Sequence, residues 1–200
     1  MAAELKQYLQ FSLVIHVLFQ ILDTPGRYAS AATIDCPDKC YCRHVDKKKS
    51  FLQVYCENNG LSAIGDIAKH LPKGVVDLSF AGNRLTRLEQ GVFSELKGLK
   101  TLYLSRNSFT AFNKEFLDVM KTLPDKFRAI DLSDNPWDCS CTAENKKFIS
   151  WIITKKGPRS TPEKDEWIAF INGYKTVCST PSNLKGRRID ELRISDICPG

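Results

Sequence analysis

Eight cysteines are the residues of this chain best suited to chemistry, and they fall into two sets of four. The sets stand on either side of a long apolar stretch: Cys36, Cys40, Cys42 and Cys56, then Cys139, Cys141, Cys178 and Cys198. Cysteines so close together either bind zinc as thiolates or form disulfides. The C-x-C spacing of the first set differs from the C-x-x-C of common zinc sites. The compartment in which the protein folds therefore decides between the two chemistries.

The first residues of the chain predict an oxidising compartment. Residues 11–22 form an apolar run that is too short to span a bilayer comfortably. Small residues follow around Ala29 and Ala31, as in the A-x-A-like cleavage site of a secretory signal peptide. We interpret residues 1–31 as a signal peptide, with an N-terminal amphipathic helix or signal anchor as the alternative. A secreted, extracellular protein with an even number of clustered cysteines is expected to contain disulfides.

Enzymatic chemistry has little support in this sequence. The histidines are His16, His44 and His70, and the motifs of serine hydrolases, zinc proteases and phosphate-binding loops are missing from the sequence. Disulfide formation would leave no thiol nucleophile. The carboxylates of Asp131 and Asp134 are expected on an open face, where nothing would desolvate them. We therefore expect a protein that is not an enzyme and uses no cofactor or metal.

Between the two cysteine sets, an asparagine recurs with a regular apolar pattern in front of it. The asparagines are Asn59, Asn83, Asn107 and Asn135, and apolar residues stand five and three positions before each. A period of 20–29 residues with the pattern L-x-x-L-x-L-x-x-N-x-L is that of a leucine-rich repeat. The apolar pair predicts a short strand with inward side chains, and the asparagine predicts a turn.

One such repeat cannot bury its own apolar side, so the copies are expected to stack. The fold predicted is an α/β, mostly β, solenoid: a short horseshoe with a parallel concave sheet. In the second full repeat, Phe116, Val119, Met120 and Leu123 are spaced as on a helix that Pro124 ends.

The two cysteine sets resemble the caps of extracellular leucine-rich repeat proteins. Residues 36–42 read C-P-x-x-C-x-C, and residues 135–141 read N-P-W-D-C-S-C. The C-terminal motif is similar to that of variable lymphocyte receptors, platelet glycoprotein Ib and Slit. This resemblance implies four disulfides: Cys36–Cys42, Cys40–Cys56, Cys139–Cys178 and Cys141–Cys198. The domains expected are a signal peptide (1–31), an N-terminal cap (32–60), repeats (61–135) and a C-terminal cap (136–200).

The C-terminal cap is longer than a minimal cap of this type, with a surplus at about residues 157–176. In the receptors it resembles, a loop at this place projects toward the concave face and contacts the ligand. The same role is predicted here, with Trp167 as a contact. The alternative is that the aromatic residues of the loop fold back onto the cap.

Side chains that alternate with the inward ones are expected on the concave face. Tyrosines among mixed charges are typical of recognition surfaces, because tyrosine offers rigid contact area at low entropic cost. The predicted ligand-binding residues are Tyr55, Asp77, Thr101, Tyr103, Arg106 and Asp131, together with Trp167 of the loop.

The net charge of +6 is uneven, since residues 139–200 hold eleven Lys and Arg against seven Asp and Glu. Lys185, Arg187 and Arg188 form a possible patch for sulfated glycans, although such a patch often serves only solubility. Nucleic acid is not expected as a partner of a secreted protein. No apolar run follows Cys198, so neither a transmembrane helix nor a GPI signal is expected.

The sequence thus predicts a secreted binding module that recognises a protein through its concave face and cap loop, as a ligand, decoy or immune recognition factor. The alternative is a matrix-associated protein that binds sulfated glycans through its basic C-terminal cap. A short subunit of a larger receptor complex is a third option. The sequence does not define an oligomeric state.

Overall fold

The structure is a computed structural model that describes residues 34–155 and 168–199. Residues 34–200 form one unit, separate from residues 1–33. The predicted signal peptide and Trp167 therefore lie outside the described residues, and the roles assigned to them stay predictions.

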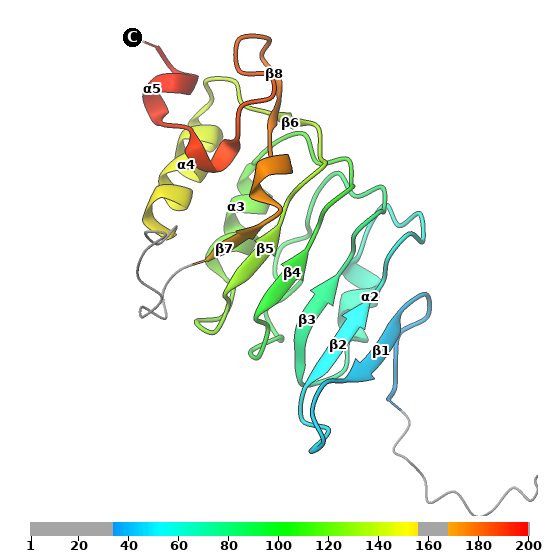
Figure 1. Cartoon of the computed structure of the whole chain (residues 1–200). Coiled ribbons are helices and arrows are strands. Elements are labelled where there is room, and N and C mark those ends of the chain that lie inside the picture. Colours follow the sequence, from blue (N-terminus) through cyan, green and yellow to red (C-terminus); the bar gives the residue numbers. More distant parts are fainter. Residues whose placement is uncertain (1–33, 156–167, 200) are drawn as a thin grey trace, which may run out of the picture. The chain divides into compact units, whose positions relative to one another are not determined.

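A six-stranded sheet runs along the unit in the order β1-β2-β3-β4-β5-β7 (Figure 1). The pair β1–β2 is antiparallel, and every following pair is parallel. The strands are β1 (Tyr41–His44), β2 (Leu52–Tyr55), β3 (Val75–Ser79), β4 (Thr101–Tyr103), β5 (Ala129–Asp131) and β7 (Ala169–Ile171). The predicted solenoid with a parallel sheet is confirmed.

The sheet keeps the register that the asparagine period predicts. Asp77 on β3 lies beside Thr101 on β4, and Thr101 lies beside Ala129 on β5. The inward side chains consequently stack in columns and are fully buried. These columns contain Val54, Leu78, Leu102 and Ile130, followed by Cys56, Phe80, Leu104 and Leu132. Each repeat thus completes the core of its neighbour, as expected for a solenoid.

Two helices follow the strands on the side of the sheet away from the concave face (Figure 1). They are α2 (Gly65–Lys69) and α3 (Lys114–Lys121). The helix α3 begins after Asn113, whose side chain accepts a hydrogen bond from the Phe116 N–H at 2.9 Å. This N-cap satisfies one of the backbone donors that have no partner within the helix. Phe116, Val119 and Met120 of the predicted pattern are buried on α3, but the helix ends at Lys121 and does not reach Leu123 and Pro124 as predicted.

The C-terminal cap is built from the remaining elements. A parallel pair, β6 (Trp137–Asp138) and β8 (Cys178–Thr180), is accompanied by α4 (Ala143–Lys155), η1 (Gly173–Lys175), η2 (Ile189–Glu191) and α5 (Ile194–Ile197). An aromatic stack joins this cap to the last repeat. The ring of Phe112 lies 4.2 Å from the Trp137 ring and 3.6 Å from the Phe148 ring, measured between centroids. These buried rings close the apolar end of the solenoid.

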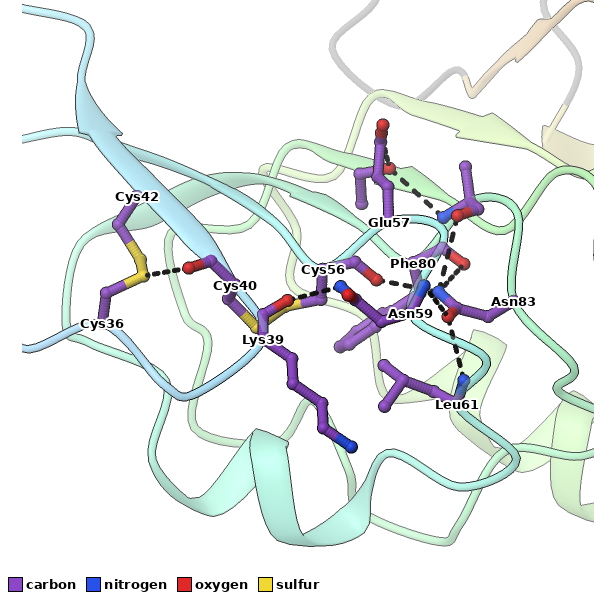
Figure 2. The surroundings of a disulfide bond; sticks show 12 residues. Cys36, Lys39, Cys40, Cys42, Cys56, Glu57, Asn59, Leu61, Phe80 and Asn83 are labelled. Carbon is purple, nitrogen blue, oxygen red and sulfur yellow. Dashed lines mark hydrogen bonds between the residues drawn. A yellow bond between two sulfur atoms is a disulfide. The ribbon is translucent and has the colours of Figure 1, made fainter.

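Each cap contains two disulfides. The structure joins the pairs that the family resemblance implies: Cys36–Cys42, Cys40–Cys56, Cys139–Cys178 and Cys141–Cys198. Figure 2 shows the N-terminal pairs, with Cys56 at the end of β2. Since Cys56 also belongs to an inward column, its disulfide ties the cap directly to the core of the first repeat.

The structure describes residues 168–176 of the loop predicted at about residues 157–176, and part of them has regular structure, while the ligand contact assigned to the loop stays a prediction. Residues 169–171 form β7, and residues 173–175 form a 3₁₀ turn. The Ala169 N–H donates to the Arg128 carbonyl at 2.7 Å, so β7 supplies partners for backbone groups that β5 would otherwise leave open at the sheet edge. The C-terminal cap therefore adds one strand to the concave sheet beyond β5.

Candidate functional site

The asparagine of each repeat holds the turn that follows its strand. The Asn83 Oδ1 accepts hydrogen bonds from the backbone N–H groups of Asn59 and Leu61, each at 3.0 Å (Figure 2). Its Nδ2 donates to the carbonyls of Cys56 at 2.8 Å and Phe80 at 2.9 Å. These bonds join two neighbouring repeats, and Asn107 and Asn135 make the same kind of bonds in the next turns. The strands are thereby fixed in register, which aligns their outward side chains.

The residue before each of these asparagines has a left-handed backbone conformation. The φ values are 55° at Asn58, 69° at Gly82, 52° at Arg106 and 53° at Asp134. At Gly82 a Cβ atom would lie 2.1 Å from the Asn58 Oδ1, so any other residue here would have to displace the Asn58 side chain. At Arg106 the same conformation places an exposed side chain at the end of β4, where the sequence predicts a ligand contact.

The N-terminal half of the concave face is a hydrogen-bonded polar surface. The Arg43 Nε donates to the Gln53 Oε1 at 2.7 Å, and the Tyr55 hydroxyl donates to the same oxygen at 2.8 Å. The Gln53 Nε2 donates to the Asp77 Oδ2 at 2.6 Å, which extends the network from β1 across β2 to β3. The Arg43 guanidinium also lies over the Tyr55 ring at 5.6 Å.

Tyr41 and Arg43 belong to this surface although the sequence analysis did not include them. Tyr41 lies opposite Tyr55, and Arg43 lies opposite Gln53, in the antiparallel pair. The Tyr41 ring stacks on the Tyr55 ring at 6.3 Å and is 63% exposed. The alternation of Tyr41 and Arg43 with Cys42 was the available signal, because it is the pattern of a strand with one outward side.

Tyr103 lies at the centre of the face, on β4. Burial raises the pKa of its phenol, and the charges of Asp77, Asp131 and Glu57 add to this effect. The Glu57 carboxylate accepts a hydrogen bond from the Ser79 hydroxyl. The centre of the concave face is thus an aromatic ring surrounded by carboxylates.

Asp131 lies beside Tyr103 on the sheet, as predicted, but its side chain is buried. Its side chain accepts hydrogen bonds from the Asn172 Nδ2 at 3.1 Å and from the Ser133 N–H at 3.0 Å. The residue is only 3% exposed, because β7 pairs with β5 and brings Asn172 over it. Asp131 therefore contributes charge and holds the end of β7, but it presents almost no surface to a ligand. Tyr55, Asp77, Thr101 and Tyr103 are the predicted concave residues that remain partly exposed.

The basic residues near the end of the chain are mostly engaged in ion pairs. The Arg188 guanidinium contacts the Asp190 carboxylate at 2.8 Å and the Glu191 carboxylate at 2.9 Å, and Arg188 is only partly exposed. Arg187 contacts Asp196 at 3.3 Å. These carboxylates offset the charges of two of the three residues of the predicted glycan patch, and Lys185 has no carboxylate partner in the part of the chain that the structure describes.

Within residues 34–155 and 168–199, no group of three or more His, Cys, Asp or Glu side chains could hold a metal ion. Among these same residues, no helix has the length and apolar character needed to cross a bilayer.

The family comparison agrees with the geometry of the repeats. The leucine rich repeat family model matches residues 73–136. Residues 73–136 are thus leucine-rich repeats, and they lie in a solenoid that has two disulfides at each end.

Several known proteins are similar to this chain. Phospholipase A2 inhibitor beta of Elaphe climacophora is 30% identical over 115 residues, which cover 58% of this chain and 29% of the inhibitor. Leucine-rich repeat-containing protein 3 of Danio rerio is 28% identical, covering 58% and 48%. CD180 antigen of Homo sapiens is 23% identical, covering 94% and 28%. The chain thus spans less than half the length of each of these relatives.

Among solved structures, human 5T4 (Wnt-activated inhibitory factor 1, trophoblast glycoprotein) has a similar fold. The TM-score is 0.54 with 22% sequence identity, and the match covers 70% of this chain and 45% of 5T4. At this identity the similarity concerns the fold alone.

Proposed function

We propose that this chain is a non-enzymatic, extracellular binding module that recognises a protein ligand through its concave face. The observation that carries the proposal is the side-chain network that runs from Arg43 through Gln53 to Asp77 beside Tyr55 and Tyr103. Tyrosine and arginine are the residues most often responsible for affinity at protein interfaces.

The network supports recognition because it fixes side chains before a ligand arrives. The Tyr55 hydroxyl has two hydrogen-bonding neighbours, Arg43 and Gln53, and the Gln53 amide has three, Arg43, Tyr55 and Asp77. A side chain that is already ordered loses less conformational entropy on binding, so more of its contact energy appears as affinity. Tyr41 and Tyr103 add aromatic area on both sides of this ordered group.

The names of the relatives favour the same kind of function. One relative is called a phospholipase A2 inhibitor, and others are CD180 antigen and Toll-like receptor 2 of Macaca mulatta. We infer a role in immune recognition or signalling, as a ligand, decoy or inhibitor of another protein. Four disulfides and the predicted signal peptide support secretion.

The test is a screen of the multimerised, disulfide-bonded protein against a library of extracellular domains. Any ligand found is then titrated against Tyr55→Ala and Tyr103→Ala variants. The control is Lys97→Ala, which changes an exposed residue between two repeats, outside the strands of the sheet. We expect each tyrosine variant to raise the Kd by about tenfold or more, as for an interface hot spot. A ligand whose affinity both tyrosine variants retain would refute a concave site.

The alternative of glycan binding through Lys185, Arg187 and Arg188 has less support, because two of these three charges are paired with carboxylates. Retention on heparin tests it. Under our proposal, Lys185→Glu leaves the eluting salt concentration nearly unchanged. A large fall in that concentration would instead support glycan binding by this patch.

A further inference from the structure

A groove between α3 and α4 lies apart from the concave face. It has a volume of about 360 Å³ and lies between side chains of the two helices: Leu117, Lys121, Lys146, Lys147, Ser150 and Trp151. Lys121 and Trp151 also line a second hollow of about 700 Å³, and we call the two hollows together the channel. Since α3 lies behind the sheet in Figure 1, a ligand here would leave the concave face open.

The floor of this channel is apolar. Leu117 and Met120 of α3 are buried, and Trp151 of α4 is partly exposed beside them. Phe127 and Leu123 continue the apolar floor into the second hollow. A ligand in the channel could therefore bury aliphatic or aromatic side chains, which favours association in proportion to the area removed from water.

The rim of the channel is strongly basic. Among the described residues that line the two hollows, the lysines are Lys121, Lys126, Lys146, Lys147 and Lys155, and the one carboxylate is that of Asp125. Among the described residues, Lys121 contacts Asp118 at 3.4 Å, whereas Lys146 and Lys147 have no carboxylate partner. Lys146 and Lys147 of the C-terminal cap thus differ from Arg187 and Arg188 near the chain end, which contact carboxylates.

We propose that the α3–α4 groove binds an acidic, amphipathic segment of a partner protein. Apolar side chains of the segment would lie on the partly exposed Trp151 ring, and its carboxylates would contact Lys121, Lys146 and Lys147. A sulfated glycan would meet the same cations but has no apolar groups for the floor, so the floor favours a peptide. The proposal is independent of the concave face, because no residue is shared between the two surfaces.

The test uses fluorescence anisotropy of a labelled synthetic peptide in which two leucines and a tryptophan are spaced between glutamates. Three variants of the protein are compared with the wild type. Lys146→Glu/Lys147→Glu reverses the rim, Ser150→Tyr fills the groove without changing charge, and Lys47→Glu/Lys48→Glu is the control. The control makes the same change in net charge on exposed lysines of the N-terminal cap.

We expect saturable binding that weakens about tenfold or more in the rim variant and in Ser150→Tyr, with little change in the control. Equal losses in the rim and control variants would overturn the proposal, because they would indicate attraction by net charge alone. Full binding by Ser150→Tyr, or no saturable binding by the wild type, would also overturn it. Heparin fragments that bind at the groove when the peptide does not would instead identify a glycan site.

Discussion

Asn107 offers the sharpest test of how the repeats are held together. Its side chain is buried and joins two turns: Oδ1 accepts from the Leu85 N–H at 3.0 Å, and Nδ2 donates to the carbonyls of Phe80 at 2.9 Å and Leu104 at 3.2 Å. In an Asn107→Ala variant, the buried Leu85 N–H loses its partner. The two carbonyls keep hydrogen bonds from Asn83 and Asn135.

The expected cost follows from these contacts. An unsatisfied buried donor costs about 1–3 kcal/mol, and each lost hydrogen bond about 1 kcal/mol more. We therefore expect Asn107→Ala to lower the free energy of unfolding by about 3 kcal/mol. Asn59 occupies the same column but is exposed, and its amide donates only to the Lys39 carbonyl. Because water can replace that bond, Asn59→Ala is expected to cost under about 1 kcal/mol.

The assay is urea unfolding of the purified, disulfide-bonded protein, followed by tryptophan fluorescence with the slopes compared between variants. Equal slopes would show that both variants unfold as the wild type does. If Asn107→Ala and Asn59→Ala cost the same within about 0.5 kcal/mol, the asparagines would not be stabilising through their buried bonds. The register of the sheet would then depend on apolar packing alone.

Three further results are expected. Phe112→Ala should lower the free energy of unfolding by about 3–5 kcal/mol in urea, because it opens a cavity in the buried ring stack. Gly82→Ala should cost more than Gly60→Ala in the same assay. Both have positive φ, but only Gly82 has an atom of Asn58 within reach of the new Cβ. A spectrophotometric titration should show one phenol ionisation above pH 10 that is absent from the Tyr103→Phe variant. Since the folded pKa is raised, this group stabilises the fold below about pH 10 and loses that contribution as the pH rises further.

The two proposed surfaces differ in charge as well as in position. The concave centre carries the carboxylates of Glu57 and Asp77 around Tyr103, whereas the α3–α4 groove carries Lys146 and Lys147, which have no carboxylate partner among the described residues. A partner suited to one surface would be repelled by the other. The chain could therefore bind two different proteins at once. In a competition experiment, the concave ligand would then not displace the acidic peptide.

The repeat architecture could be predicted from the sequence because its signals are local. A strand needs two alternate apolar residues, a turn needs an asparagine three residues later, and both are visible within each repeat. The exposed positions of Tyr55, Asp77 and Tyr103 followed from the same alternation, since neighbouring side chains of a strand point to opposite faces. The ion pair of Arg188 with Asp190 was also within reach, because only one residue separates them.

The contacts between distant segments were decided by the tertiary structure. The pairing of β7 with β5 brings Asn172 to Asp131 across 41 residues, and it turned a predicted contact residue into a buried one. The groove between Leu117 and Trp151 likewise requires α3 and α4 to pack together. By itself, the sequence determined which side chains each strand and helix presents. Only folding decided which of them are covered or paired, because burial and ion pairing depend on neighbours that no local pattern specifies.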